Sequence, residues 1–437
     1  MRGTFLNRNR GSASAATAVW GKLGAGLITG AADDDPSGIG TYAQAGAAWG
    51  FQLAWTLLLT YPLMVAIQAI SARIGRTTGR GIAGNLRQYY PNALLQSIVG
   101  ALLVANVLNL GADLGAMAEC LRLLTRSLPA WVWIALFGTV CTVLQLACSH
   151  TRYIAVLKWL TLALLTYFAV LAVVRISWLA VLKGLIVPGW SSDRTLWLMV
   201  VALLGTTISP YLFFWQAGQE VEDTKADPQR VPLRRKPAQG ASALARIRID
   251  TLIGMGISNL VGLAILITTG ATLYRSGIHQ VTTAAQAAQA LQPLAGRFAF
   301  VLFTVGLIGS GLLAVPVLAG SAAYALGEAR RWPVGLARKP LEAKAFYGTI
   351  AAATIVGALA NAASLNPMQA LVWAAVINGI VAVPVMVLLM QMATSRRVMG
   401  NFRISMRLRA LGWAATALML LAAMGLAVSV TLASRSS

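Results

Sequence analysis

The chain has 437 residues, of which 57% are hydrophobic and only 11% charged, and its mean hydropathy is +0.70. This composition excludes an ordinary soluble domain and predicts an all-α protein that crosses a membrane many times. The net charge of +22 does not indicate a nucleic-acid partner, because the basic residues are spread over the loops and no recognition domain accompanies them. It favours contact with anionic membrane lipid instead.

Apolar windows of span length recur along the chain and predict about eleven membrane-spanning helices in one transporter domain, residues 1–437. They lie near residues 22–48, 51–72, 93–117, 128–148, 153–174, 196–219, 250–272, 297–326, 345–364, 366–392 and 408–434. Most of the 35 Lys and Arg residues fall on one side if the amino terminus is cytoplasmic. The positive-inside rule therefore predicts a multi-pass protein of the bacterial inner membrane in that orientation.

The first predicted span is interrupted by Asp33-Asp34-Asp35-Pro36-Ser37-Gly38. Acidic residues inside a span are costly and usually face a polar pathway. Pro36 lacks an amide hydrogen and leaves carbonyl groups free, so carboxylates and carbonyls together form a ligand set for a hard cation. The alternative is a loop between two short helices, but the flanking apolar stretches are together one span long.

The sixth predicted span is interrupted in the same way at residues 205–211, where Pro210 follows small polar residues. Two interrupted spans at matching positions indicate a secondary transporter built from two inverted five-helix repeats, the leucine-transporter-like fold. The repeats are expected at 22–174 and 196–392, and 408–434 is an additional helix. The longest inner loop, residues 221–249, is expected to be a solvated and partly mobile linker.

Most acidic residues are expected to be solvated, because they fall at span ends or in loops. These are Glu119, Asp193, Glu220, Glu222, Asp223, Asp227, Asp250, Glu328 and Glu342. Besides the three aspartates of the first span, only Asp113 remains, and it shares a helical face with Asn109 and Asn106. This polar stripe either lines a water-filled path or bonds to a broken helix. Ser310 and Asn378 are expected to join helices rather than bind a ligand.

Enzymatic alternatives have little support in the sequence. His150 and His279 have no cysteine or second histidine at ligand spacing, which argues against a zinc site. No glycine-rich phosphate loop with a lysine is present, so ATP-driven transport is not expected. The three cysteines predict no disulfide framework. The sequence therefore predicts no enzyme and no cofactor, and it leaves the oligomeric state undefined.

The broken first span and residues 205–210 resemble those of the natural resistance-associated macrophage protein (NRAMP) family of divalent-metal transporters, and the resemblance covers nearly the whole chain. The family pattern is Asp-Pro-Gly-Asn in the first broken helix and Met-Pro-His in the sixth. Here Asp35 is retained, Gly38 stands in place of the asparagine, Ser209 in place of the methionine and Tyr211 in place of the histidine. In the third span Asp113-Leu114-Gly115-Ala116 lacks the family's second acid.

These departures have chemical consequences. Replacing a thioether by the Ser209 hydroxyl makes the site harder. The missing side chain at Gly38 is expected to leave space for a cation that keeps its waters, as Mg²⁺ does. Loss of the histidine and of the second acid argues against obligatory proton coupling. The combination is similar to the NRAMP-related magnesium transporter branch, which implies transport of Mg²⁺ and Mn²⁺.

From this resemblance we expect a secondary transporter of hydrated Mg²⁺, and of Mn²⁺, working by alternating access without obligatory proton coupling. The metal ligands are expected to be Asp35, the carbonyl groups of Ala32 and Thr206, the Ser209 hydroxyl, and the backbone at Gly38. Pathway residues are expected to be Asp33, Asp34, Asp113, Asn109, Tyr211 and Asn378. The alternatives are a proton-coupled Mn²⁺ or Fe²⁺ symporter, an amino-acid transporter of the same fold, and a membrane protein that does not transport.

Overall fold

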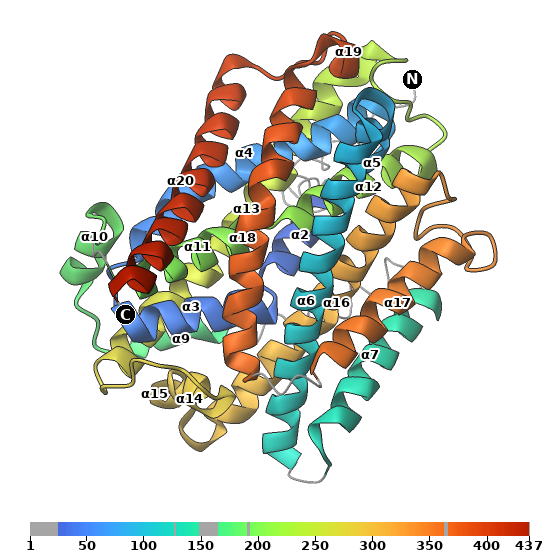
Figure 1. The fold of residues 1–437 in the computed structure, drawn as a ribbon. Helices are drawn as coiled ribbons and strands as arrows, with labels where there is room; N and C mark the ends of the chain where they lie inside the picture. Colours follow the sequence, from blue (N-terminus) through green and yellow to red (C-terminus); the bar gives the residue numbers. More distant parts are fainter. Residues whose placement is uncertain (1–24, 126–127, 148–164, 190–192, 362–365, 437) are drawn as a thin grey trace, which may run out of the picture.

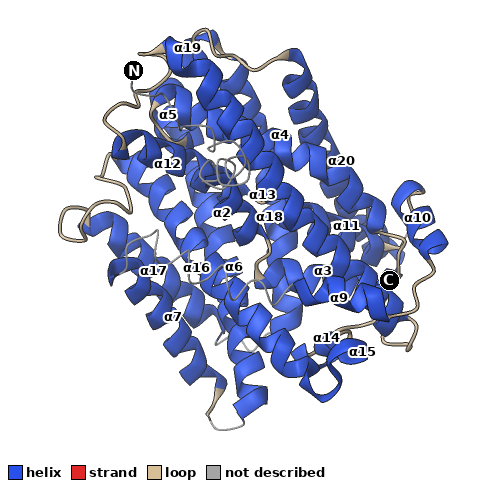
Figure 2. Cartoon of the chain, turned by 180° about the vertical axis from the view of Figure 1, so that it is seen from behind, coloured by secondary structure: helices blue, strands red, loops and turns tan. Residues whose placement is uncertain are grey.

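The computed structural model describes residues 25–125, 128–147, 165–189, 193–361 and 366–436, and all regular structure in these ranges is helical (Figures 1 and 2). The helices that correspond to predicted spans are α2 (Ala25–Asp33) with α3 (Pro36–Trp49), α4 (Ala54–Thr78), α6 (Asn92–Thr125), α7 (Ala130–Ala147), α9 (Thr166–Val173), α11 (Arg194–Thr207) with α12 (Pro210–Ala226), α13 (Gly240–Thr269), α16 (Ala299–Arg330), α17 (Lys344–Ala360), α18 (Pro367–Thr394) and α20 (Met406–Ser436).

Shorter elements connect these helices. They are α5 (Ile82–Tyr89), α10 (Trp178–Ile186), α14 (Ala284–Gln289), α15 (Gln292–Ala295), α19 (Arg396–Met399), the 3-10 turns Pro237–Gln239 and Gly296–Phe298, and a π turn, Gly270–Tyr274, that continues α13. In the described part of the chain, seven helical segments are long and apolar enough to cross a membrane, and α7 and α17 are shorter apolar helices. The predicted span at 153–174 lies mostly outside the described residues, and only α9 represents it.

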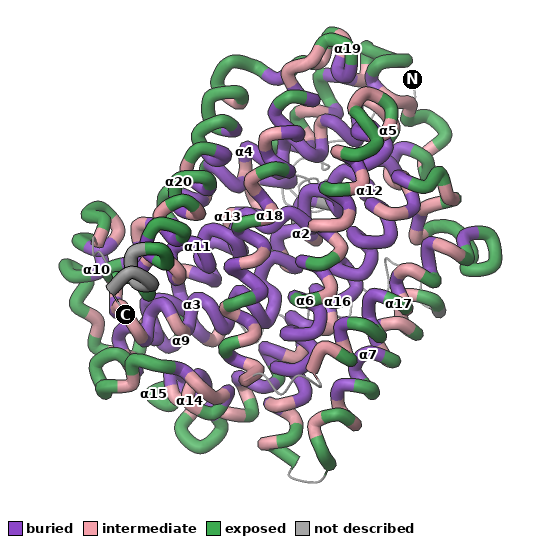
Figure 3. Tube along the Cα trace, in the orientation of Figure 1, coloured by how far each residue is buried: buried purple, intermediate pink, exposed green. Residues whose placement is uncertain are grey.

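The two interrupted spans, which we call helices 1 and 6, lie side by side near the middle of the bundle. Helix 1 is α2 with α3, and helix 6 is α11 with α12; α2 packs against α12, and α3 packs against α11. This crossed pairing means that helices 1 and 6 run antiparallel, so their two breaks meet. The surrounding helices bury α2, α3 and α11 almost completely, whereas α20 and α10 expose long stretches of surface (Figure 3).

Glycine contacts allow the helices around the breaks to approach closely. A Cβ atom at Gly30 of α2 would lie 2.2 Å from the Gly254 carbonyl oxygen of α13. A Cβ atom at Gly205 of α11 would lie 2.1 Å from the Ala375 carbonyl oxygen of α18. Small residues at such crossings are the usual device for packing helices in a membrane. Helices 1 and 6 are thereby each held against a helix of the surrounding bundle.

The expected linker at 221–249 is in large part helical, so that prediction was wrong. Residues 221–226 complete α12, and α13 begins at Gly240. The short loop between them is tied to the bundle: Arg76 of α4 donates a hydrogen bond to the Val231 carbonyl at 2.7 Å, and the Leu233 amide donates to the Arg76 carbonyl at 3.2 Å. Charge and proline content suggested a mobile segment. Composition could not reveal these hydrogen bonds, because the bonded residues are far apart in the sequence.

Several acidic residues that the sequence assigned to solvent are buried and paired. Glu220 is 0% exposed and forms an ion pair with Arg246. Asp250 is 1% exposed and accepts a hydrogen bond from the Gly26 amide at 2.7 Å. Glu328 accepts backbone amide hydrogen bonds at the start of α5. Position at the end of a span therefore did not mean contact with water, because neighbouring helices extend past the apolar windows.

Candidate functional site

The break in helix 1 is formed by Asp35 and Pro36. Asp35 is the N-cap of α3, with φ −70° and ψ 169°, and its Oδ1 accepts hydrogen bonds from the Gly38 amide at 2.6 Å and the Ser37 hydroxyl at 2.7 Å. Pro36 then occupies the first helical position, where the missing amide hydrogen costs nothing. The three consecutive carboxylates therefore lie at the junction of two half-helices rather than in a solvated loop.

The break in helix 6 has the same backbone plan. Ser209 is the N-cap of α12, with φ −79° and ψ 132°, and Pro210 occupies the first helical position. The Ser209 hydroxyl does not cap α12; it donates back to the carbonyl groups of Gly205 at 2.7 Å and Thr206 at 3.0 Å. Two of the predicted ligands, the Thr206 carbonyl and the Ser209 hydroxyl, are therefore bonded to each other in this conformation.

The Asp35 carboxylate of helix 1 is hydrogen-bonded both to α6 and to helix 6. Its Oδ2 accepts hydrogen bonds from Asn109 of α6 at 3.1 Å and from the Tyr211 hydroxyl of α12 at 3.2 Å. The residue is 2% exposed. A carboxylate with four donors in a buried position is held rigidly and attracts positive charge. Asn109 and Tyr211, predicted as pathway residues, therefore contact the predicted central ligand directly.

The Tyr211 hydroxyl lies between two predicted ligands, because it is 3.1 Å from the Ala32 carbonyl oxygen and 3.2 Å from Asp35 Oδ2. One hydroxyl has one proton and donates to one of these acceptors at a time. Ala32 belongs to the carboxyl end of α2, where the helix dipole favours a cation. A metal ion bound by both acceptors must displace the tyrosine proton or use the phenol oxygen as a further ligand.

The expected space at Gly38 is absent. A Cβ atom there would lie 3.2 Å from the Asp33 carbonyl oxygen, 3.2 Å from Thr206 Oγ1 and 3.4 Å from Asp35 Oδ1. The absent side chain has instead allowed helices 1 and 6 to approach each other. Gly38 therefore leaves no space for the waters of a hydrated cation in this conformation, contrary to the prediction, because neighbouring atoms occupy the space that its side chain would take.

Asp33 and Asp34 face α13 rather than the break. The Ser258 hydroxyl is 2.6 Å from Asp33 Oδ2 and 3.2 Å from Asp34 Oδ1, and both aspartates are buried. Asp33 Oδ1 has no hydrogen-bond partner within the described residues. The contact of Ser258 with these aspartates was not predicted, since a single serine in an apolar span gives no sign of the helix that it faces. Of the three successive carboxylates, Asp33 and Asp34 therefore contact α13, whereas Asp35 contacts α6 and α12.

Asp113 and Asn378 are buried close to helices 1 and 6, respectively. Asp113 is fully buried, and neither of its carboxylate oxygens has a hydrogen-bond partner among the described residues. Asn378 likewise lacks a partner for its amide in that part of the chain, and its neighbour Gly379 packs against Gly205. Asp113 lies one turn after Asn109, which bonds to Asp35 at the break in helix 1, whereas Asn378 makes no hydrogen bond to a predicted ligand among the described residues.

A thioether also lies beside the break and was missed from the sequence. Met117, one turn after Asp113 on α6, has its Sδ 2.3 Å from the position of a Cβ atom on Gly311, and Pro36 Cγ is 3.1 Å from the same point. Met117 follows Asp113 by four residues, which places both on one face of α6, and this spacing was the signal available in the sequence.

Among the described residues, no three His, Cys, Asp or Glu side chains form a metal-binding group. The predicted site therefore depends on one carboxylate with carbonyl and hydroxyl oxygens.

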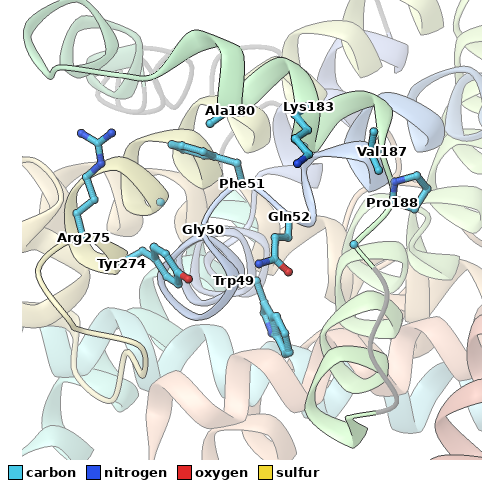
Figure 4. A pocket seen from close by; sticks show the side chains of 13 residues that line it. Trp49, Gly50, Phe51, Gln52, Ala180, Lys183, Val187, Pro188, Tyr274 and Arg275 are labelled. Atoms are coloured by element: carbon cyan, nitrogen blue, oxygen red, sulfur yellow. The ribbon is translucent and has the colours of Figure 1, made fainter.

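Two cavities near the carboxyl end of α3 differ in charge. One, of about 590 Å³, is lined by Gln44, Asp193 and His279 together with residues of α11 and α18. The other, of about 440 Å³, contains the Lys183 and Arg275 side chains beside Trp49 and Tyr274 (Figure 4). Because cations repel a metal ion, the first cavity suits a metal ion better than the second.

Hydrogen bonds tie the segment between α13 and α14 to α3 and to the start of α18. Gln44 of α3 donates a hydrogen bond to the His279 carbonyl at 3.2 Å and accepts one from the Val281 amide at 2.7 Å. Asn366 donates to the Thr282 carbonyl at 2.9 Å, which ties the same segment to the start of α18. The segment after α13 therefore covers α3, while Asp35 stays buried below it.

Comparison with known proteins identifies relatives across nearly the whole chain. A family model described as "Natural resistance-associated macrophage protein-like" matches residues 26–429. The divalent metal cation transporter MntH of Deinococcus radiodurans is 30% identical over 310 residues, 68% of this chain and 67% of that protein. MntH of Ralstonia nicotianae is 29% identical over 67% of this chain, and the match spans 66% of that relative, slightly less than two thirds. MntH of Verminephrobacter eiseniae is 28% identical over 87% of this chain and 82% of its own length.

Solved structures show the same fold. A manganese transporter of Eremococcus coleocola superposes with a TM-score of 0.72 at 18% identity, covering 97% of this chain and 89% of that one. The inward-facing structure of Mhp1 gives a TM-score of 0.52 at 14% identity over 94% of this chain and 92% of that one. These likenesses confirm the predicted all-α, leucine-transporter-like fold. The repeat boundaries at 22–174 and 196–392 remain predictions.

Proposed function

Because the chain belongs to the natural resistance-associated macrophage protein family, we propose that it moves divalent cations across a membrane by alternating access around Asp35, with Mn²⁺ as the principal substrate. Members of this family are metal-ion transporters and not enzymes, and the metal is their cargo rather than a resident cofactor. The meeting of two broken helices at one buried carboxylate is the observation that carries the proposal.

The comparisons favour Mn²⁺, whereas the departures of this sequence from the family pattern suggested Mg²⁺. The relatives are named divalent metal cation transporters, and the similar solved structure is a manganese transporter. The filled volume at Gly38 also removes one argument for a fully hydrated cation. Mn²⁺ accepts oxygen ligands as Mg²⁺ does, so Asp35 with the carbonyl groups of Ala32 and Thr206 is a suitable donor set.

Mg²⁺ remains the second candidate because of Ser209. The hydroxyl stands where the family has a thioether, so helix 6 offers only oxygen donors at this break. Oxygen ligands alone discriminate weakly between Mg²⁺ and Mn²⁺. We propose that Mg²⁺ competes with Mn²⁺ for transport, and that inward transport requires no obligatory proton movement because Tyr211 replaces the family's histidine.

The test is uptake into proteoliposomes that contain the purified full-length protein and a pH indicator inside. Mn²⁺ entry that excess Mg²⁺ inhibits, without internal acidification, is the expected result. Acidification that follows Mn²⁺ in fixed proportion would show a proton symporter and overturn the coupling proposal alone. Absence of uptake of either cation, in protein that unfolds cooperatively on heating, would overturn the transport proposal.

A further inference from the structure

A basic cavity lies between the carboxyl ends of α4 and α12 and the loop that follows α12. These elements meet at the end of the bundle near α5 (Figure 1). Its volume is about 440 Å³. Its charged lining side chains are four cations, Arg80, Lys225, Arg230 and Arg235, and one carboxylate, Asp227. The sequence assigns this end to the cytoplasm. No residue of the candidate metal site lines it.

The loop wall of this cavity is fixed by a buried arginine. Arg76 is 3% exposed; its Nη1 donates to the Val231 carbonyl at 2.7 Å and its Nη2 donates to Gln239 Oε1 at 2.9 Å. Gln239 Nε2 in turn donates to the Gln229 carbonyl at 2.7 Å. These bonds cross the loop and hold it against α4, so the cavity is formed before any ligand arrives.

The back of the cavity is closed by contact between Gly79 and Pro232. Gly79 ends α4 with φ +70°, and a Cβ atom on it would lie 2.6 Å from Pro232 Cγ. A left-handed conformation and this close approach both require glycine. The wall that carries the cationic side chains is therefore set at a defined distance from the end of α4.

The protein neutralises only part of the positive charge of the cavity. Asp227 Oδ2 pairs with Arg230 Nε at 3.1 Å, which accounts for one cation. Arg234 turns away and donates to the Tyr89 hydroxyl at 3.0 Å. In the described ranges no hydrogen bond or ion pair engages the guanidinium groups of Arg80 and Arg235, and both residues are exposed. Two guanidinium groups without a partner in the described ranges thus face one preformed space, together with Lys225, which lies near Glu222 and Glu328.

We propose that this cavity binds a phosphate-bearing anion, which is either an anionic phospholipid headgroup or a soluble polyphosphate. Guanidinium groups match phosphate oxygens with paired hydrogen bonds. Basic pockets at the cytoplasmic ends of membrane helices suit anionic headgroups. Lys225 belongs to α12, the second half of helix 6, so the ligand joins that half to α4. The inference does not rest on the proposed transport function.

The test measures binding to purified full-length protein in a neutral detergent. One arm titrates pyrophosphate by calorimetry, and the other adds phosphatidylglycerol and counts retained lipids by native mass spectrometry, with zwitterionic phosphatidylcholine for comparison. The cavity variant carries Arg80→Ala with Arg235→Ala. The matched control carries Arg403→Ala with Arg407→Ala, which removes the same charge from exposed arginines outside the cavity.

We expect saturable binding of one ligand per chain, weakened about tenfold or more in the cavity variant and unchanged in the control. Pyrophosphate binding alone identifies a soluble polyphosphate, and phosphatidylglycerol binding alone identifies a lipid headgroup. Failure of both arms, or equal loss in the two double variants, overturns the proposal. If the cavity variant unfolds early, Arg235→Glu supplies the same test at a single exposed position.

Discussion

Helices 1 and 6 are each broken one residue before a proline, yet Asp35 and Ser209, the residues before those prolines, use their side chains in opposite directions. Asp35 accepts hydrogen bonds from the half-helix that follows it. Ser209 donates to the half-helix that precedes it. A carboxylate only accepts hydrogen bonds, whereas a hydroxyl has a proton to give, so each satisfies a different set of free backbone groups.

The same backbone break therefore produces two different surfaces. Helix 1 presents a buried negative charge, and helix 6 presents neutral oxygen atoms. Attraction of a cation should depend on helix 1, and choice between cations should depend on helix 6. Substitutions at the two breaks test this division, since they are expected to change different quantities.

Asp35→Asn carries the largest expected effect. It keeps the size of the side chain and removes its charge, so uptake of Mn²⁺ should fall more than about a hundredfold, beyond the 10- to 100-fold cost of losing a supporting partner of a metal ligand. Proteoliposome uptake measures it. Asp227→Asn, at a surface ion pair, is the matched control and should transport normally. Near-normal uptake by Asp35→Asn would show that the Asp35 carboxylate is not a metal ligand.

Ser209→Met should change selectivity rather than rate. A thioether is a soft ligand, so uptake of Mn²⁺ and Cd²⁺ relative to Mg²⁺ should rise about tenfold. Ser209→Ala is the control: it removes the hydroxyl without adding sulfur and should leave the Mn²⁺ to Mg²⁺ ratio nearly unchanged. Equal ratios in all three proteins would contradict a role of helix 6 in selection.

Tyr211→Phe tests the contact between the two breaks. The hydroxyl competes with a cation for the Ala32 carbonyl and for Asp35, so its removal should tighten Mn²⁺ binding about tenfold or more, as expected for loss of one hydrogen bond to a charged group. Calorimetric titration gives the dissociation constant. Weaker binding would instead identify the phenol oxygen as a metal ligand.

Ser258→Ala should have the smallest effect and act on stability. It removes the hydroxyl that Asp33 and Asp34 share across the α2 and α13 contact. The free energy of unfolding should fall by about 1 kcal/mol, because hydrogen bonds between membrane helices contribute modestly. Thermal unfolding of the purified protein measures it, with Ser310→Ala as the control, since that hydroxyl bonds within its own helix. Equal shifts in both variants would argue against the shared contact.

Most of the spans, both breaks and the position of Asp35 at the first break could be predicted from the sequence, because each leaves a local signal. Apolar windows mark helices, and Pro36 and Pro210 mark the interruptions. The burial of Glu220 and Asp250 could not be predicted, since their partners Arg246 and Gly26 lie on other helices. The same limit applied to Ser258 and Met117, whose neighbours depend on which face of a helix meets which partner.

By itself the sequence determined a helical membrane protein with two interrupted spans, because hydrophobicity and proline act within a few residues of the chain. Only the tertiary structure decided how the oxygen atoms near Asp35 are used. It set Tyr211 between Ala32 and Asp35 and filled the volume at Gly38. The physical reason is that hydrogen-bond partners and free volume depend on the distance between helices, and packing fixes that distance only when the whole bundle forms.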